Sequence, residues 1–208
     1  MGALDYKLHD GDIQHWDFHD WSFHTFTPAI IGAFPEPFLH GYGGKTSPTI
    51  IVCPDSLKEE AGDLRSNLVR LGVSNVGIKR FSQLSVEEKE LANLILLGTA
   101  DSEPVSELDQ VWKRLGFFAH FQDSNIVVLN SRGEVAAEYG VGTGIIQATQ
   151  SPWNPNGVGA CENVVWMVSG TDEAGVKSAI DALINHHAEF QYAHAIVVAS
   201  GETIRVPQ

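Results

Sequence analysis

The chain has few basic residues: 13 Lys and Arg stand against 26 Asp and Glu in 208 residues, which gives a formal net charge of −13. An acidic surface repels phosphate backbones, and the sequence has no run of Lys and Arg, so we expect no nucleic-acid partner. Long apolar runs are also missing. No stretch approaches the ~20 apolar residues of a membrane helix, so we expect no insertion of this chain into a membrane.

Cysteine is scarce as well. Cys53 and Cys161 are not part of a CxxC pair, which excludes a zinc ribbon and a thioredoxin-type redox site. We expect both to be buried thiols. Cys53 ends one predicted strand and Cys161 precedes another. In a parallel sheet they would lie at opposite ends, on the order of 10 Å or more apart and beyond the ~7 Å Cα limit for bridging. The sequence therefore predicts no disulfide between them.

Several nucleotide-binding and hydrolase motifs are missing too. The sequence contains no Walker lysine motif and no GxSxG elbow. Gly140, Gly142 and Gly144 precede IIQAT, which predicts a strand, whereas the dinucleotide fingerprint needs a helix after its glycines. No set of nucleophile, base and oxyanion donors is visible. We therefore expect no cofactor, and we leave catalysis open while favouring its absence.

From residue 49 onward, apolar β-branched runs alternate with amphipathic stretches. The runs that predict strands are TIIVC (49–53), VGIKRF (76–81), LILLG (94–98), NIVVLN (125–130), GIIQAT (144–149), NVVWMVSG (163–170) and AIVVASG (195–201). The predicted helices have N-caps at Ser56, Ser85, Ser102 and Asp172, and the first two have a capping-box glutamate three residues later.

This alternation predicts an α/β domain over residues 49–208. We expect three layers, formed by a mostly parallel sheet with helices on both faces. The strand-rich region 117–150 has no helical pattern and should add antiparallel edge strands.

Residues 1–48 have a different character. Asp10-Gly11 is a turn signal between two alternating stretches, which predicts an N-terminal β-hairpin. Residues 27–48 carry four prolines and four glycines and predict an extended arm. The arm should lie against the body through its apolar residues, Ile30, Ile31, Phe34 and Phe38.

The stretch HDGDIQHWDFHDWSFH (9–24) is crowded with histidine, aspartate and aromatic residues. On a strand, His15, Asp17 and His19 share one face, while Trp16 and Phe18 share the other and should pack against the body. His15 and His19 would be ~13 Å apart, too far to bind one metal together at zinc bond lengths of ~2 Å. We favour an aromatic-packed hairpin. The alternative is a metal site in which Asp17 acts with either His15 or His19 and the other ligands come from elsewhere, such as His9, His24 or His40.

Two predicted strands end in the same way, in Gly98-Thr99 and in Gly170-Thr171, and each leads into a helix. In parallel sheets, ligands gather where strands end and helices begin. Gly98, Thr99, Gly170, Thr171 and Asp172 are therefore candidates for a ligand-binding pocket. The alternative is that Gly-Thr-Asp makes a tight turn and a helix cap.

The loop SPWNPNG (151–157) is held rigid by two prolines. Trp153 and Asn154 are candidate ligand-binding residues, because the indole ring could stack on a sugar or clamp a partner. The structural alternative, which we favour, is that Trp153 is buried and fixes the end of a strand.

Three stretches, NLILLGT, GTGIIQATQSPWNPNG and VVWMVSGTDEAGVKSAIDAL, resemble an S-layer-like α/β domain of archaeal and bacterial exported surface proteins. The resemblance covers about residues 49–188. It depends on residues that keep the order and approximate spacing of the family, namely Trp153, Asn154, Gly170, Asp172 and Gly175. It implies a structural domain with no catalytic residues to carry over.

The front end, DYKLHDGDIQHW, resembles the closing hairpin of a transcobalamin C-terminal-like domain, at about residues 4–18. In relatives this module is associated with cobalamin binding or with surface adhesins. Only its last residues are present, and MGALDYK lacks the layout of a signal peptide. We therefore expect a fragment of a longer exported protein whose signal sequence is absent from this fragment.

Together these features favour a non-catalytic domain of an exported, cell-surface or extracellular protein. Its role would be assembly, display or weak ligand recognition, with other surface-protein domains or cell-wall components as partners. Two alternatives stay open. One is a metal-binding protein or metal-dependent enzyme that uses the N-terminal segment, and the other is a small-molecule, cobalamin-like binding module.

Overall fold

The structure is a computed structural model that describes residues 7–9, 13, 14, 16, 26 and 28–207. Its strands are β1 (Thr49–Val52), β2 (Val76–Lys79), β3 (Asn93–Thr99), β4 (Ala119–Gln122), β5 (Asn125–Leu129), β6 (Val135–Tyr139), β7 (Gly144–Gln150), β8 (Val164–Gly170), β9 (Ala195–Ala199) and β10 (Glu202–Val206). Its α-helices are α1 (Lys58–Arg70), α2 (Val86–Leu91), α3 (Glu103–Asp109), α4 (Trp112–Leu115) and α5 (Glu173–Asn185), and short 3-10 turns are η1 (Asp55–Leu57), η2 (Phe81–Gln83) and η3 (His187–Phe190).

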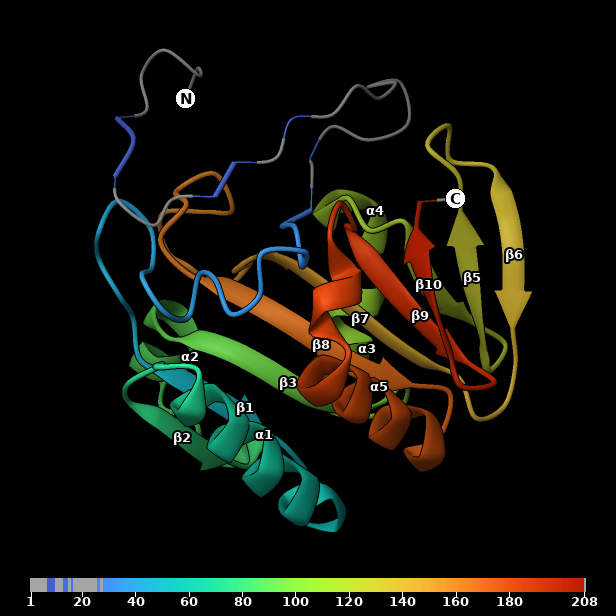
Figure 1. The fold of residues 1–208 in the computed structure, drawn as a ribbon, viewed down its shortest axis with the longest axis horizontal. Helices are drawn as coiled ribbons and strands as arrows, with labels where there is room; N and C mark the ends of the chain where they lie inside the picture. The colour runs from blue at the N-terminus through green and yellow to red at the C-terminus, as the bar shows by residue number, and fades with distance from the viewer. Residues whose placement is uncertain (1–6, 10–12, 15, 17–25, 27, 208) are drawn as a thin grey trace.

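The main sheet has seven strands in the order β10-β9-β7-β8-β3-β1-β2 (Figure 1). β2, β1, β3 and β8 pair in parallel, whereas β7 is antiparallel to both of its neighbours and β10 is antiparallel to β9. The predicted α/β class is thus confirmed. The sheet is mixed, with a parallel part and an antiparallel edge at β10.

The expected placement of region 117–150 at the edge of this sheet is wrong. β7 lies inside the sheet, between β8 and β9, and all but its last residue are buried. Buried backbone N–H and C=O groups need hydrogen-bond partners, and a strand between two neighbours finds them on both sides. β4, β5 and β6 form a separate three-stranded antiparallel sheet, which the sequence did not predict.

Both faces of the main sheet are covered by helices, as the sequence predicts. On one face, α1 and α5 lie side by side and bury their apolar stripes against the strands (Figure 1). On the other face, the second core cluster contains α3, residues of α4 and the buried side of the three-stranded sheet. The molecule therefore has three layers, and one outer layer combines helices with strands.

The arm lies against the body, as predicted, but it is not extended. Residues 31–40 form consecutive turns, and Ile31 and Phe38 are almost completely buried. The rings of Phe34 and Phe38 lie 5.6 and 5.3 Å from the Trp166 ring on β8. These aromatic contacts make the arm part of the same hydrophobic core as α1 and α5.

The turn of the predicted N-terminal hairpin, Asp10-Gly11, lies outside the described residues, as does Phe18. The described residues between 7 and 16 are assigned to no strand. Trp16 is 75% exposed, so the expectation that it packs against the body is wrong.

The two cysteines are free, which confirms that they do not pair with each other. Cys53 is buried as expected, whereas Cys161 is exposed in the loop before β8 and does not match the predicted burial. Among the described residues, no helix has the length and apolar character that crossing a membrane requires.

Candidate functional site

The carboxyl ends of β1, β2, β3 and β8 meet at one edge of the main sheet, because these four strands run in parallel. The helices that follow β1 and β3 lie on opposite faces, α1 in one core cluster and α3 in the other. Open α/β sheets bind their ligands at such an edge, near the point where the connections change face. A ligand site is therefore expected along this edge.

The two glycine–threonine turns come together here. Thr99 pairs with Gly170 in the register between β3 and β8, so Gly98, Thr99, Gly170 and Thr171 are neighbours in space. The turn after β3 is closed by its own side chain: the Ser102 hydroxyl donates to the Thr99 carbonyl at 2.6 Å. A Cβ added at Gly98 would lie 2.2 Å from the Ser102 oxygen. The Ser102 side chain thus occupies the space beside Gly98 that a ligand would need.

The turn after β8 is closed in the same way. The Thr171 hydroxyl donates to the Gly140 carbonyl at 3.2 Å. Asp172 is the N-cap of α5, as predicted: one carboxylate oxygen accepts from the Gly175 amide and the other from the Gly142 amide, each at 2.8 Å. Asp172 therefore uses both oxygens to join α5 to the loop that precedes β7.

Glycines let the start of α5 approach the sheet closely. A Cβ at Gly175 would lie 2.2 Å from the Thr143 carbonyl oxygen, and one at Gly170 would lie 2.4 Å from the Val176 nitrogen. Real Cβ atoms do not approach backbone so closely, so only glycine fits at these positions. The assignment of this end of β3 and β8 to ligand binding stays a prediction, and its polar groups already have partners within the chain.

A pocket lies further along the same edge, at the ends of β1 and β2. Its volume is about 140 Å³, and it is lined by Cys53, Pro54, Asp55, Lys58, Ile78, Lys79, Arg80 and Gln83. These residues come from the turn into α1, from the end of β2 and from η2. The pocket therefore combines three cations with one carboxylate, in a chain that is strongly acidic overall.

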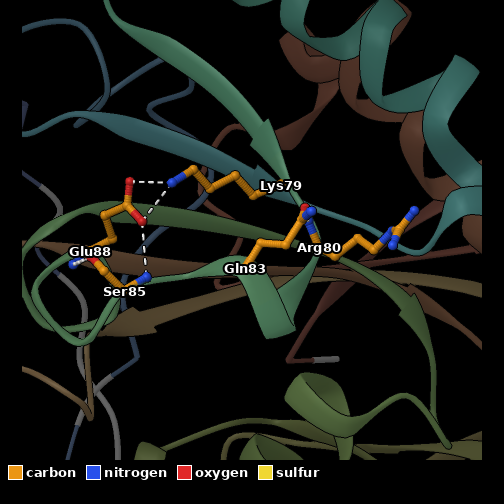
Figure 2. Close-up of polar contacts among 5 residues, drawn as sticks. All are labelled: Lys79, Arg80, Gln83, Ser85 and Glu88. Carbon is orange, nitrogen blue, oxygen red and sulfur yellow. Dashed lines mark hydrogen bonds and ion pairs between the residues drawn. The ribbon is translucent and has the colours of Figure 1, made fainter.

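The charges at the end of β2 separate into two pairs. Figure 2 shows the side chains of Lys79 and Arg80 leaving the strand in opposite directions, with Lys79 reaching Glu88. The Lys79 ammonium lies 2.6 and 2.8 Å from the two Glu88 carboxylate oxygens. Glu88 also accepts from the Ser85 amide at 3.0 Å, within the predicted capping box of α2, which is confirmed.

Arg80 forms the second pair, with Asp55 at 2.8 Å. Both side chains are more than half exposed, and a pair of this kind stabilises a protein by at most about 1 kcal/mol. Lys58, by contrast, has no carboxylate partner among the described residues. The end of β1 and β2 therefore holds one unpaired cation and one weakly paired cation.

Cys53 is the buried cysteine among the residues that line the pocket. Burial raises the pKa of this thiol, and the nearby Asp55 carboxylate raises it further. The thiol consequently stays protonated at neutral pH, which makes it a poor nucleophile and adds no negative charge to the pocket.

The sequence did not indicate this pocket, because Lys58 is far in the chain from Lys79 and Arg80. The parallel pairing of β1 with β2 brings them together: Val52 pairs with Lys79, and the Cys53 amide donates to the Lys79 carbonyl. The available signal was the Lys79-Arg80 dipeptide at the end of a predicted strand, in a chain with few basic residues.

A second, wider hollow lies between α5 and the β9–β10 hairpin. Its charged residues are largely engaged within the chain: Lys177 pairs with Glu60 and Glu173, and Glu189 accepts from the Thr203 hydroxyl at 2.6 Å. These internal pairs leave fewer groups for a ligand than the pocket at β1 and β2 has.

Trp153 and Asn154 lie at the opposite end of the sheet, because β7 runs antiparallel to β8. The structure therefore does not join them to the glycine turns in one site. The Trp153 indole donates to the Glu107 carboxylate at 2.8 Å, and the Lys89 ammonium lies 4.5 Å from its ring centroid. These contacts tie the loop to α2 and α3 and favour the structural role of Trp153. The side chain is only half-buried, however, so the predicted burial is met only in part.

Asn154 belongs to a buried amide network. Its amide nitrogen donates to the side-chain oxygen of Asn163 at 2.8 Å and to Glu162 at 3.0 Å, and its oxygen accepts from the Asn156 amide. Asn163 in turn donates to the carbonyl of Ala92. The network fastens the 151–163 loop to the start of β3.

The predicted metal ligands His15, Asp17 and His19 lie outside the described residues. Within the part of the chain that the structure describes, no group of three or more His, Cys, Asp or Glu residues could hold a metal ion. The metal site stays a prediction.

No protein-family model matches the chain, and the curated proteins searched contain no significant match to it.

Proposed function

We propose that the chain is a non-catalytic domain of an exported cell-surface protein. It acts in assembly, display or weak ligand recognition, and its partners are other surface-protein domains or cell-wall components. The proposal starts from the resemblance of residues 49–188 to S-layer-like domains.

The observation that carries the proposal is the internal use of the residues on which the resemblance depends. Both carboxylate oxygens of Asp172 accept hydrogen bonds from backbone amides. The side-chain amide of Asn154 donates to neighbouring side chains. Gly170 and Gly175 permit close backbone contact. A motif whose polar groups are all directed inward supports a role in shaping the domain rather than in turning over a substrate.

Location is tested on intact cells of the organism that makes the protein. An antibody raised against this chain should label unpermeabilised cells, and external protease should remove the native protein while a cytosolic marker survives. Recovery of the native protein only with the cytosolic marker would refute an exported protein. Catalysis is tested separately: we expect no turnover on an esterase, phosphatase and glycosidase panel, and turnover abolished by one point substitution would contradict this.

The metal alternative has its own test. We expect zinc or nickel to leave the melting temperature unchanged, because the described residues hold no group of ligands that would couple metal binding to folding. Saturable, stoichiometric stabilisation that disappears in His15→Ala would instead support a metal site.

Small-molecule recognition is the second candidate function, and the pocket at β1 and β2 favours it. Its volume of about 140 Å³ is well below the ~300–1,000 Å³ of pockets that hold drug-sized ligands. A ligand of this pocket is therefore a small molecule or one small group of a larger one.

A further inference from the structure

The strongest candidate for an unassigned site is the pocket that Cys53, Asp55, Lys58, Arg80 and Gln83 line at the ends of β1 and β2. Its position agrees with where α/β sheets bind ligands. Its charge also stands out: in a chain of net charge −13, three of the thirteen Lys and Arg residues line this one hollow.

The start of α1 adds a further attraction for anions. The sequence predicts a capping box at Ser56 and Glu59, but the structure has none: η1 begins after Pro54 and α1 after Leu57. Neither Pro54 nor Leu57 has a side-chain acceptor, and no side-chain cap is found at either start. The Leu57 amide donates to the Pro54 carbonyl and the Lys58 amide to the Asp55 carbonyl, so the start of α1 contributes only the general attraction of a helix N-terminus for negative charge.

We propose that this pocket binds a small tetrahedral oxyanion, of phosphate or sulfate type, through the side chains of Arg80 and Lys58. The inference rests on the ligand-recognition part of the proposed function and names its ligand class. An oxyanion of this size fits a hollow of about 140 Å³, and the planar guanidinium of Arg80 can donate two hydrogen bonds to it.

Asp55 is the internal competitor of this anion. It accepts a hydrogen bond from Arg80, and their exposed pair is weak. A bound dianion would take the place of the Asp55 carboxylate at Arg80. Lys79 contributes little, because both Glu88 oxygens hold its ammonium.

The test is a calorimetric titration of the full chain with inorganic phosphate at constant ionic strength. We expect one saturable site with a dissociation constant of about 1 mM. Arg80→Gln and Lys58→Gln should each weaken binding about tenfold, which corresponds to one charge-assisted contact. Both side chains are exposed, and melting curves of the variants would verify that they still fold.

The matched control is Arg132→Gln, which removes the same charge from the turn between β5 and β6. It should change the phosphate affinity less than about twofold, because a remote exposed charge is screened by salt. Asp55→Asn removes the competitor and should tighten binding about threefold. A merely structural Asp55 would not produce this gain.

Two further titrations identify the source of the anion. If a sugar phosphate binds more tightly than inorganic phosphate, the natural ligand is a group carried on a larger molecule; equal affinities indicate the free ion. Sulfate should bind with an affinity similar to that of inorganic phosphate. Tighter binding of the sugar phosphate and equal affinities of the two phosphates each support the proposal.

Three results would overturn the proposal: no saturable phosphate binding, equal losses in Arg80→Gln and Arg132→Gln, or acetate binding as tightly as phosphate. None of them bears on whether the native protein is exported, which the labelling of intact cells decides. Failure of the pocket and failure of the surface-domain assignment are therefore distinguishable.

Discussion

The carboxyl edge of the main sheet has two parts that differ in how their polar groups are used. At the ends of β3 and β8, glycine turns bring backbone segments so close that the chain itself fills the space. At the ends of β1 and β2, larger charged side chains surround an open hollow. This difference shows that glycine at the end of a strand does not by itself indicate a ligand site, because it can equally allow a helix to pack closely against the sheet.

The largest effect that this comparison predicts is at Gly175 in α5. Gly175→Ala should lower the free energy of unfolding by about 3 kcal/mol or more, because the new methyl group would meet the Thr143 carbonyl at 2.2 Å. The measurement is urea denaturation followed by circular dichroism.

Gly62, in α1, is the matched control. A Cβ there meets nothing within 4 Å, so Gly62→Ala should stabilise the protein by about 0.5–1 kcal/mol through the better helix propensity of alanine. If the two variants had equal stability, α5 would not be in close contact with the β7 end of the sheet.

The next largest effect compares the two helix starts. Asp172→Ala removes the cap of α5 and should cost about 1–2 kcal/mol in the free energy of unfolding. Ser56→Ala, near the start of α1, should change it by less than about 0.5 kcal/mol, because Ser56 caps no amide. A comparable loss in Ser56→Ala would show that the predicted capping box forms in solution.

A smaller effect is expected at the opposite end of the sheet. Trp153→Phe keeps an aromatic ring beside Lys89 but removes the indole donor to Glu107. We expect a loss of about 1 kcal/mol in chemical denaturation, with correct folding retained. If Trp153→Phe were as stable as the parent chain, the bond to Glu107 would contribute nothing and the ring would be available to a ligand.

The smallest effect concerns pH and two carboxylates, Asp109 on α3 and Glu88 beside the pocket. Burial raises the pKa of Asp109, although the Phe121 amide that donates to it opposes the shift. Above the ordinary Asp pKa of about 3.9 and up to this raised pKa, the folded state binds more protons than the unfolded state. The free energy of unfolding therefore falls as the pH rises through that window.

Asp109→Asn removes this pH dependence and keeps an acceptor for the Phe121 amide. We expect the variant to be more stable than the parent chain at neutral pH, by at most about 1 kcal/mol, and to lose this advantage in acid. Denaturation curves at both pH values check this, and an advantage that grows in acid would contradict it.

Glu88 should respond in the opposite direction. The hydrogen bond from Lys79 is the main reason that its pKa is lowered, with a further contribution from the Ser85 backbone. Its contribution to stability is present at neutral pH and is lost as the pH falls through the lowered pKa. Glu88→Gln should accordingly be less stable than the parent chain at neutral pH and equal to it in acid.

Local features of the sequence were enough to predict several parts of the molecule. The seven apolar runs became strands, the capping box at Ser85 and the cap at Asp172 formed, and the arm packed through Ile31, Phe34 and Phe38. These features depend on the period of apolar residues and on hydrogen bonds over three or four positions, which the order of residues alone specifies.

Other features were decided only by the tertiary structure. The sequence predicts a strand at GIIQATQ but does not show that β7 pairs with both β8 and β9. The sequence also does not show that the SPWNPNG loop (151–157), which carries Trp153, lies at the opposite end of the sheet from the glycine turns. Strand order and direction depend on which pairings bury the most apolar surface at once, and this is a property of the whole chain.

The pocket at the ends of β1 and β2 shows most clearly which features the sequence predicts and which only the tertiary structure decides. By itself the sequence determined a scarcity of cations, a predicted strand that ends in Cys53 and another, VGIKRF, that contains Lys79 and Arg80. Only the parallel register of β1 and β2 places Lys58 and Arg80 around one hollow. The physical reason is that charges interact over a few ångströms of space, and residues more than twenty positions apart reach that distance only through pairing of their strands.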